Sequence, residues 1–114
     1  MTTTEFIDKL RQTPEEIIFE ETINVIDTYY SFTPSSFTNG EINNEVGQNS
    51  GSCKLFSFAK LQNLTQEETL YCFGEHYKNV LQDPNGSSHQ NIRNFMKTGW
   101  EKLSFKEQAL TEKV

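Results

Sequence analysis

The sequence contains few of the residues from which covalent or metal-based frameworks are built. Its 114 residues include two cysteines, two histidines, one tryptophan and three prolines. Cys53 and Cys72 are too few for a disulfide framework, so we expect two reduced, mostly buried thiols. The cysteines and histidines also lack the paired short spacing typical of zinc sites, since only Cys72 and His76 lie one helical turn apart. We therefore predict neither a metal nor a cofactor.

Long apolar runs and basic clusters are also missing. No segment approaches the ~18 apolar residues of a membrane-spanning helix, and the N-terminus has no cationic head like that of a cleavable signal peptide. The formal net charge is −6, with two bases against nine acids in residues 1–50 and eight bases against seven acids in residues 51–114. Because nucleic acids and anionic membranes are bound through cations, we expect neither as a partner.

Aromatic residues are plentiful instead. The chain has nine Phe, four Tyr and one Trp, and each such side chain buries roughly 150–250 Å². They can build a core even though only 34% of the residues are hydrophobic. Because the length is that of one ordinary domain, we predict a single domain over residues 1–114.

The first thirty residues carry two helix-start signals. Thr2 and Glu5 form a capping box, which predicts a helix over Thr3–Gln12. The segment Thr13–Glu16 is a second start, with threonine as the N-cap and proline at the first helical position. The apolar stripe that follows predicts one continuous helix from this start to about Ser31.

The chain is organised around the stretch Asn39–Lys54, which separates two helical halves and holds three of the six glycines. The dipeptide Asn39-Gly40 predicts a type I′ turn inside a short hairpin over Phe37–Ile42. A loop rich in glycine and asparagine follows over residues 46–52. This loop is the first place to look for a functional site.

Residues 53–61 are compatible with a strand, from the alternation at Phe56 and Phe58, and with a short buried helix, and we favour the helix. Ser50 or Ser52 is the expected N-cap, because a serine hydroxyl can accept a hydrogen bond from the first turn. Asn63 is expected in the left-handed conformation that often follows a helix end.

The second half begins with another capping box. It starts at Thr65 and predicts a helix that ends at the Asp83–Gly86 turn. Ser87 or Ser88 then starts a further helix. Beyond Lys102, a further helix start and a strand pairing with the 37–42 segment are both compatible with the pattern, and we favour the strand. The chain is therefore predicted to be α+β and helix-dominated, with four to five helices and a small antiparallel β element.

Cys53 is the candidate nucleophile. It follows Ser52 near an expected helix start, where the helix dipole and Lys54 would lower the pKa of its thiol. A nucleophile needs a base, and His89 can supply one from a polar loop before a helix. The alternative is a packed structural cysteine, because free cysteine is among the most buried residue types. Whether the protein is an enzyme therefore stays open.

The glycine-rich segment also suggests a site for a small anion. Backbone N–H groups and a lysine near a helix start can hold a carboxylate or a phosphate, although no complete phosphate-binding motif is present. The candidate ligand-binding residues, all with amide, hydroxyl or cationic side chains, are Asn39, Asn49, Ser52, Lys54, Asn91 and Arg93. The alternative is structural: the asparagines occupy loop conformations, and Asn91 and Arg93 anchor the loop by bonding its carbonyls.

Five groups of residues occur in a fixed order along the chain. They are Thr22-Ile23-x-x-Ile26, Pro34-x-x-Phe37-x-Asn39-Gly40, Gly47-x-Asn49-x-Gly51-Ser52-Cys53-Lys54, Phe73-Gly74-x-x-Tyr77 and His89-x-Asn91-Ile92-Arg93-x-Phe95-Met96-x-x-Gly99-Trp100. In these groups the chain resembles the HopJ type III effector family of Gram-negative bacteria. The resemblance covers residues from about Phe19 to Phe105.

The resemblance implies a protein made in the bacterial cytoplasm and exported into a host cell by a type III system, without a cleavable signal peptide. It implies no catalytic residues. We therefore expect an effector that acts by binding a host protein, with a secretion chaperone as a second partner and a monomer as the acting form. The alternative is a cytosolic bacterial protein with a small-ligand pocket under the Asn49–Lys54 loop, or a cysteine-dependent enzyme that uses Cys53.

Overall fold

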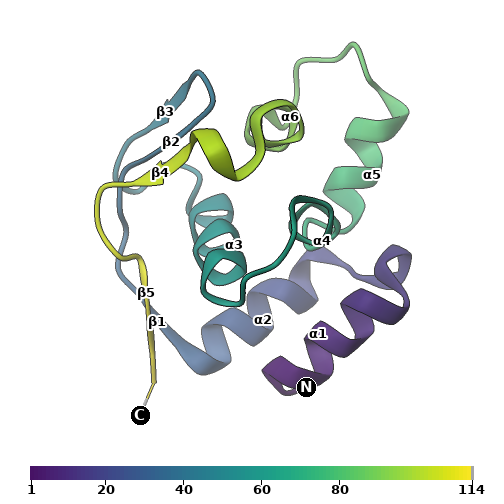
Figure 1. The fold of residues 1–114 in the computed structure, drawn as a ribbon, viewed down its shortest axis with the longest axis vertical. Coiled ribbons are helices and arrows are strands. Elements are labelled where there is room, and N and C mark those ends of the chain that lie inside the picture. The colour runs from purple at the N-terminus through teal and green to yellow at the C-terminus, as the bar shows by residue number, and fades with distance from the viewer. Residues whose placement is uncertain (114) are drawn as a thin grey trace.

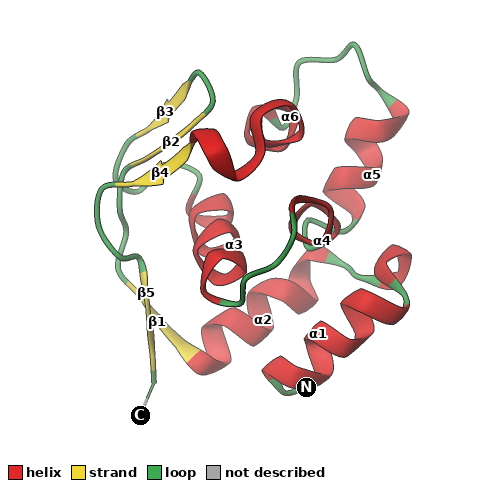
Figure 2. Ribbon diagram, viewed as in Figure 1, coloured by secondary structure: helices red, strands yellow, loops and turns green. Residues whose placement is uncertain are grey.

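The computed structural model describes residues 1–113. Helices dominate this α+β fold, as predicted, and the two small sheets are antiparallel (Figures 1 and 2). The elements are α1 (Thr3–Gln12), a 3₁₀ turn (Pro14–Glu16), α2 (Phe19–Tyr29), β1 (Tyr30–Phe32), β2 (Phe37–Asn39), β3 (Ile42–Asn44), α3 (Ser50–Leu61), α4 (Gln66–Tyr71), α5 (Glu75–Gln82), α6 (Gln90–Thr98), a second 3₁₀ turn (Gly99–Lys102), β4 (Leu103–Phe105) and β5 (Leu110–Glu112). None of the helices in residues 1–113 is long and apolar enough to span a bilayer.

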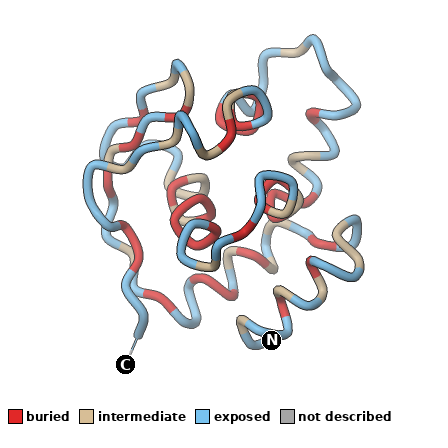
Figure 3. The backbone as a smooth tube through the Cα atoms, in the orientation of Figure 1, coloured by how far each residue is buried: buried red, intermediate tan, exposed pale blue. Residues whose placement is uncertain are grey.

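Helix α3 forms the centre of the molecule, as Figures 1 and 3 show. Its residues from Leu55 to Ala59 are all buried, because a helix with apolar side chains on several sides must be covered on several sides. The ring of Phe56 lies close to aromatic rings from β2, from α6 and from the turn between α4 and α5. The ring centroids of Phe37, Phe73 and Phe95 lie 6.2, 5.4 and 4.8 Å from it. The glycine-rich loop therefore leads directly into the core.

The capping boxes predicted at the starts of α1 and α4 are confirmed. The Glu5 amide donates to Thr2 Oγ1 over 3.1 Å, and the Thr2 amide donates back to Glu5 Oε1 over 2.8 Å. Thr65 and Glu68 exchange the same pair of bonds. These starts are correctly predicted because both partners lie within four residues of each other.

The prediction of one helix from Pro14 to Ser31 is wrong. Only a 3₁₀ turn follows Thr13, and α2 begins at Phe19. The chain between them is extended and places Ile17 in the core, 1% exposed. The helix restarts where the Phe19 amide donates to Glu75 Oε1 over 2.7 Å, a contact between residues 56 positions apart.

The single helix predicted after Thr65 is also interrupted, so residues 1–113 form six α-helices and not four or five. Gly74 separates α4 from α5 with φ of 58° and ψ of −126°. A Cβ atom there would lie 2.6 Å from the Phe19 nitrogen and 2.8 Å from the Ile17 oxygen. Both helix interruptions therefore occur at the point where the backbone at Gly74 packs against the backbone of residues 17–19.

The hairpin of β2 and β3 is confirmed, but its turn is not the predicted one. Asn39 pairs with Ile42, so the turn residues are Gly40 and Glu41. Gly40 has a positive φ and Glu41 does not, whereas a type I′ turn needs positive φ at both positions. Asn39 is thus a strand residue whose fully buried side chain points inward.

The tail forms two strands. β4 pairs antiparallel with β2, with Phe37 opposite Phe105, which confirms the favoured strand over the alternative helix start. β5 pairs with β1, so that Tyr30 lies opposite Glu112; the sequence pattern did not predict this sheet. The helix expected to end near Ser31 stops at Tyr29 because β1 begins at the next residue.

The starts of α3 and α6 differ from the expected serine caps. Helix α3 begins at Ser50 after Asn49 with φ of 51°, and α6 begins at Gln90 after His89 with φ of 52°. Neither helix has a side-chain cap. At the other end of α3, Asn63 has the predicted left-handed conformation, with φ of 55°.

Candidate functional site

A cavity of about 520 Å³ lies where the first turns of α3 and α6 approach each other. We call it the histidine cavity because His76 of α5 lines it as well as His89. Four of the predicted site residues line this cavity: Asn49, Ser52, His89 and Asn91. Phe19 and Phe73 add an apolar wall. Four helices thus contribute to a cavity that lies beside the loop rich in glycine and asparagine.

The two helix starts at this cavity have no negative group of their own. The first turns of α3 and α6 contain no acidic residue, whereas α1, α2, α4 and α5 each carry a glutamate there. The free N–H groups of a helix start carry a partial positive charge that favours an anion. The left-handed residues before both helices keep their side chains from capping these groups in the usual way.

Aromatic rings form a column along one wall of the cavity. The rings of Phe73 and Phe19 are nearly parallel, with centroids 6.1 Å apart. His76 meets the Phe19 ring at 4.9 Å, and the His89 ring lies 5.0 Å from that of His76. Partial burial, and then the charges of His76 and Arg93, lower the pKa of His89. Neutral His89 can donate or accept one hydrogen bond, and a bound anion would favour its protonated form.

A buried network of asparagines lies behind the cavity. Asn39 Nδ2 donates to the backbone oxygen and to Oδ1 of Asn91, over 2.7 and 3.1 Å. Asn44 and Asn91 exchange two amide bonds of 3.1 and 3.0 Å, and Asn49 Nδ2 donates to Asn44 Oδ1 over 2.6 Å. The network joins the hairpin to the starts of α3 and α6. This placement favours the structural alternative for Asn39, Asn49 and Asn91, although Asn49 and Asn91 also line the cavity.

Cys53 lies in the core and not in the cavity wall. Its side chain is 1% exposed, and Sγ donates to the Ser35 carbonyl over 3.7 Å. Burial raises the pKa of the Cys53 thiol, and the hydrogen bond to the Ser35 carbonyl opposes this only in part. The expected lowering of this pKa by the helix start and Lys54 is therefore wrong. His89 lines the histidine cavity, which Cys53 does not line, so the geometry does not support a nucleophile–base pair.

Lys54 and Arg93 do not line the histidine cavity either. Lys54 Nζ lies 2.9 Å from Asp27 Oδ1 and 5.1 Å from the centroid of the Phe32 ring. Arg93 is 8% exposed and donates to the carbonyls of Asp83 and Ser88. Arg93 is thus a structural anchor, as the structural alternative predicted. It anchors the loop between α5 and α6, however, and not the predicted glycine-rich loop.

The predicted site residues did not include Asn44, His76 or Phe19, which belong to the cavity wall or to the network behind it. Asn44 could have been found, because inward-facing strand positions alternate and Asn44 lies opposite the buried Phe37. His76 and Phe19 had no such signal, because their positions depend on the interruptions at Gly74 and Ile17. Within residues 1–113, no group of three or more His, Cys, Asp or Glu side chains is suited to hold a metal ion.

The fold and site define a small helix-dominated α+β protein with a polar cavity between two helix starts. Residues 3–110 match the model of the family described as HopJ type III effector protein. The chain belongs to this family, and the resemblance seen in the five residue groups is confirmed over nearly its whole length.

A solved structure has the same fold. The chain is 50% identical to the protein in the "Crystal structure of unknown function protein VPA0580", with a TM-score of 0.97. The match covers 99% of this chain and 95% of that chain. No curated protein matches the chain.

Proposed function

We propose that this protein is a type III effector that acts by binding a host protein and not by covalent catalysis. Membership of the HopJ family supports delivery through a type III system. The main observation in favour of binding rather than covalent catalysis is the burial of Cys53, which raises the pKa of its thiol. Only the thiolate is a good nucleophile. A secretion chaperone that holds the monomer before export belongs to the same proposal.

Export is tested with a translocation reporter fused to the C-terminus of the full chain. The fusion is expressed in a bacterium with an intact type III apparatus and in a mutant that lacks the secretion ATPase. We expect reporter signal inside host cells from the first strain only. Equal signal from both strains contradicts type III export, as does no signal from either when a known effector fusion is delivered.

The binding mode is tested with Cys53→Ala. Purified wild-type and variant chains are incubated with host-cell extract, and the retained proteins are compared by mass spectrometry. We expect the same retained proteins, because the thiol contributes packing and no chemistry. If the folded variant loses a host-cell effect that the wild type produces, the cysteine-dependent enzyme becomes the better interpretation.

The histidine cavity supports a second candidate function, the binding of a small anion. The specific observation is that two uncapped helix starts without acidic residues line one cavity with two histidines. Such a site suits a phosphate or a carboxylate. Ser52 and the free backbone N–H groups in the first turns of α3 and α6 would supply polar contacts, and His89 would become protonated as the anion binds.

This candidate is tested by titrating inorganic phosphate into the ¹⁵N-labelled full chain, with chloride at matched ionic strength as reference. We expect amide shifts at Ser52 and Asn91 and a rise in the pKa of His89. Ser52→Asp should abolish these changes, because a carboxylate in the first turn of α3 occupies the anion position and also favours the helix. Ser104→Asp, an exposed position in β4, adds the same charge and should retain them. Equal responses to phosphate and chloride would contradict the site.

A further inference from the structure

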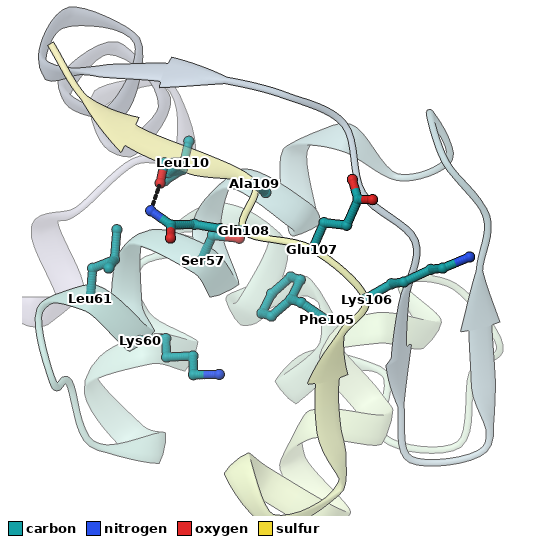
Figure 4. Close-up of a pocket in the computed structure, with 9 residues that line it drawn as sticks. All are labelled: Ser57, Lys60, Leu61, Phe105, Lys106, Glu107, Gln108, Ala109 and Leu110. Carbon is teal, nitrogen blue, oxygen red and sulfur yellow. Dashed lines mark hydrogen bonds between the residues drawn. The ribbon is translucent and has the colours of Figure 1, made fainter.

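A second cavity, of about 490 Å³, lies beside the C-terminal half of α3 (Figure 4). We call it the Ser57 cavity. One side is formed by Ser57, Lys60 and Leu61 of α3, and the other by residues 105–110 between β4 and β5. It contains none of the residues that line the histidine cavity. Its volume is within the range of small-molecule sites.

The Ser57 hydroxyl is buried at this cavity without a hydrogen-bond partner among residues 1–113. The residue is 7% exposed. The Cys53 thiol lies one turn earlier and is affected by this hydroxyl, but no contact between them has hydrogen-bond geometry. Buried hydroxyls in folded proteins are nearly always paired. An unpaired one that lines a cavity indicates that its partner comes from outside the chain.

Lys60 supplies a positive charge at the same cavity. Its ammonium forms no ion pair with a carboxylate among residues 1–113. Nζ lies 5.9 Å from the centroid of the Phe105 ring, across the cavity. Lys106 and Glu107 also line the cavity, but their side chains extend away from Ser57 in Figure 4. Lys60 is therefore the cation best placed to meet a ligand bound at Ser57.

The walls of the Ser57 cavity are held open by the backbone. The Lys106 amide donates to the Ser36 carbonyl over 3.0 Å, and the Glu107 amide donates to Ser35 Oγ over 3.0 Å. The Ala109 carbonyl accepts from the Thr33 amide over 2.8 Å. The segment between β4 and β5 is thus fixed to the segment between β1 and β2. The space does not depend on a flexible loop, which lowers the cost of binding.

We propose that the Ser57 cavity binds a small organic acid with a short apolar or aromatic body. The Lys60 ammonium and the Ser57 hydroxyl both donate to the carboxylate. The apolar body packs against Phe105, Leu61 and Leu110. This assignment is independent of the type III proposal and of the histidine cavity, because no residue is shared.

The probes are benzoate and octanoate, titrated into the ¹⁵N-labelled full chain. We expect saturable amide shifts at Ser57, Lys60 and Ala109. Benzamide has the shape of benzoate without its charge. We expect it to bind at least roughly tenfold more weakly than benzoate, because hydrogen bonds to a charged group are stronger. Equal binding of benzoate and benzamide overturns the acid assignment, and absence of shifts with both acids overturns the site.

Three variants separate the site from a general surface effect. Ser57→Ala and Lys60→Gln should each weaken benzoate binding roughly tenfold. Lys106→Gln loses the same charge from a side chain that points away and should retain binding. Because the Ser57 hydroxyl has no partner, Ser57→Ala should not lower the midpoint of thermal unfolding, so loss of binding is separable from loss of folding. Equal loss in Lys60→Gln and Lys106→Gln overturns the proposal.

Discussion

Asn91 uses both polar atoms of its side chain within the protein. Its Oδ1 accepts from Asn39 and Asn44, and its Nδ2 donates to Asn44. All three residues are at least nine-tenths buried. An amide left unpaired in such surroundings bears its full desolvation cost. At the scale of single residues, the network is therefore the part of the site most sensitive to substitution.

We expect Asn91→Ala to lower the free energy of unfolding by about 2–3 kcal/mol, because it removes three buried side-chain hydrogen bonds, one with Asn39 and two with Asn44. Denaturant unfolding followed by circular dichroism measures this. Asn43→Ala changes an exposed asparagine between the two strand positions 42 and 44, and should stay within about 0.5 kcal/mol of the wild type. Equal effects of the two substitutions would show that the network contributes little to stability.

Both cysteine thiols should be unreactive in the folded protein. Cys53 is 1% and Cys72 0% exposed, and burial raises the pKa of each thiol. We expect Ellman's reagent at pH 8 to label neither thiol in buffer and both in guanidinium chloride. The Cys72→Ala variant isolates Cys53, and rapid labelling of its native state would contradict the burial and revive the catalytic hypothesis.

At the scale of elements, a helix-start signal was reliable only where its surroundings agreed with it. The boxes at Thr2 and Thr65 open helices, whereas the segment Thr13–Glu16 forms a single 3₁₀ turn. The outcome at Thr13 differs because of the residue that follows this segment, Ile17. Ile17 reaches the core only from extended backbone, and this burial outweighs the local preference for continuing the helix.

Gly74 should be among the least replaceable residues. Gly74→Ala forces a side chain into φ of 58° and places Cβ 2.6 Å from the Phe19 nitrogen. We expect a loss of about 3 kcal/mol or more in the free energy of unfolding. Gly47 also has a positive φ, of 86°, but a Cβ atom there would have no neighbour within 4 Å, so Gly47→Ala should cost only about 1–2 kcal/mol. Thermal unfolding measures both, and equal losses would mean that the close approach at Gly74 is unimportant.

At the scale of the whole molecule, stability should fall in two stages as the pH is lowered. The pKa of His89 is lowered, mainly by burial. Below about pH 6.5, His89 therefore takes up a proton more readily in the unfolded chain than in the folded one. Backbone hydrogen bonds lower the pKa of Glu68 and Glu75. Their contribution is present above the ordinary glutamate pKa of 4.5 and is lost as the pH falls through their lower folded-state pKa values.

The midpoint of thermal unfolding, measured from pH 8 to pH 3, tests this expectation. It should be level above about pH 7, fall slightly near pH 6 and fall more steeply below about pH 4.5. His89→Gln should remove the first step and leave the second. A midpoint that rises as the pH drops from about 7 to about 5.5 would contradict the lowered pKa of His89.

The amino-acid pattern alone was enough for the features that depend on neighbouring residues. These are the fold class, the capped helix starts at Thr2 and Thr65, the hairpin, and the pairing of the tail with Phe37. Capping boxes and alternating strands involve residues that are close along the chain or share an apolar face, so the pattern contains the information.

Long-range packing set where the long helices are interrupted and which side chains share a cavity. The interruptions arise where Gly74 meets Phe19, and the histidine cavity joins residues from 19 to 92. Cys53 and Arg93 were predicted as site residues because a thiol and a guanidinium suit catalysis and anion binding. In the structure Cys53 is a core residue and Arg93 anchors a loop. Burial and long-range contacts set the pKa and the accessibility of a side chain, and both depend on residues that are distant along the chain.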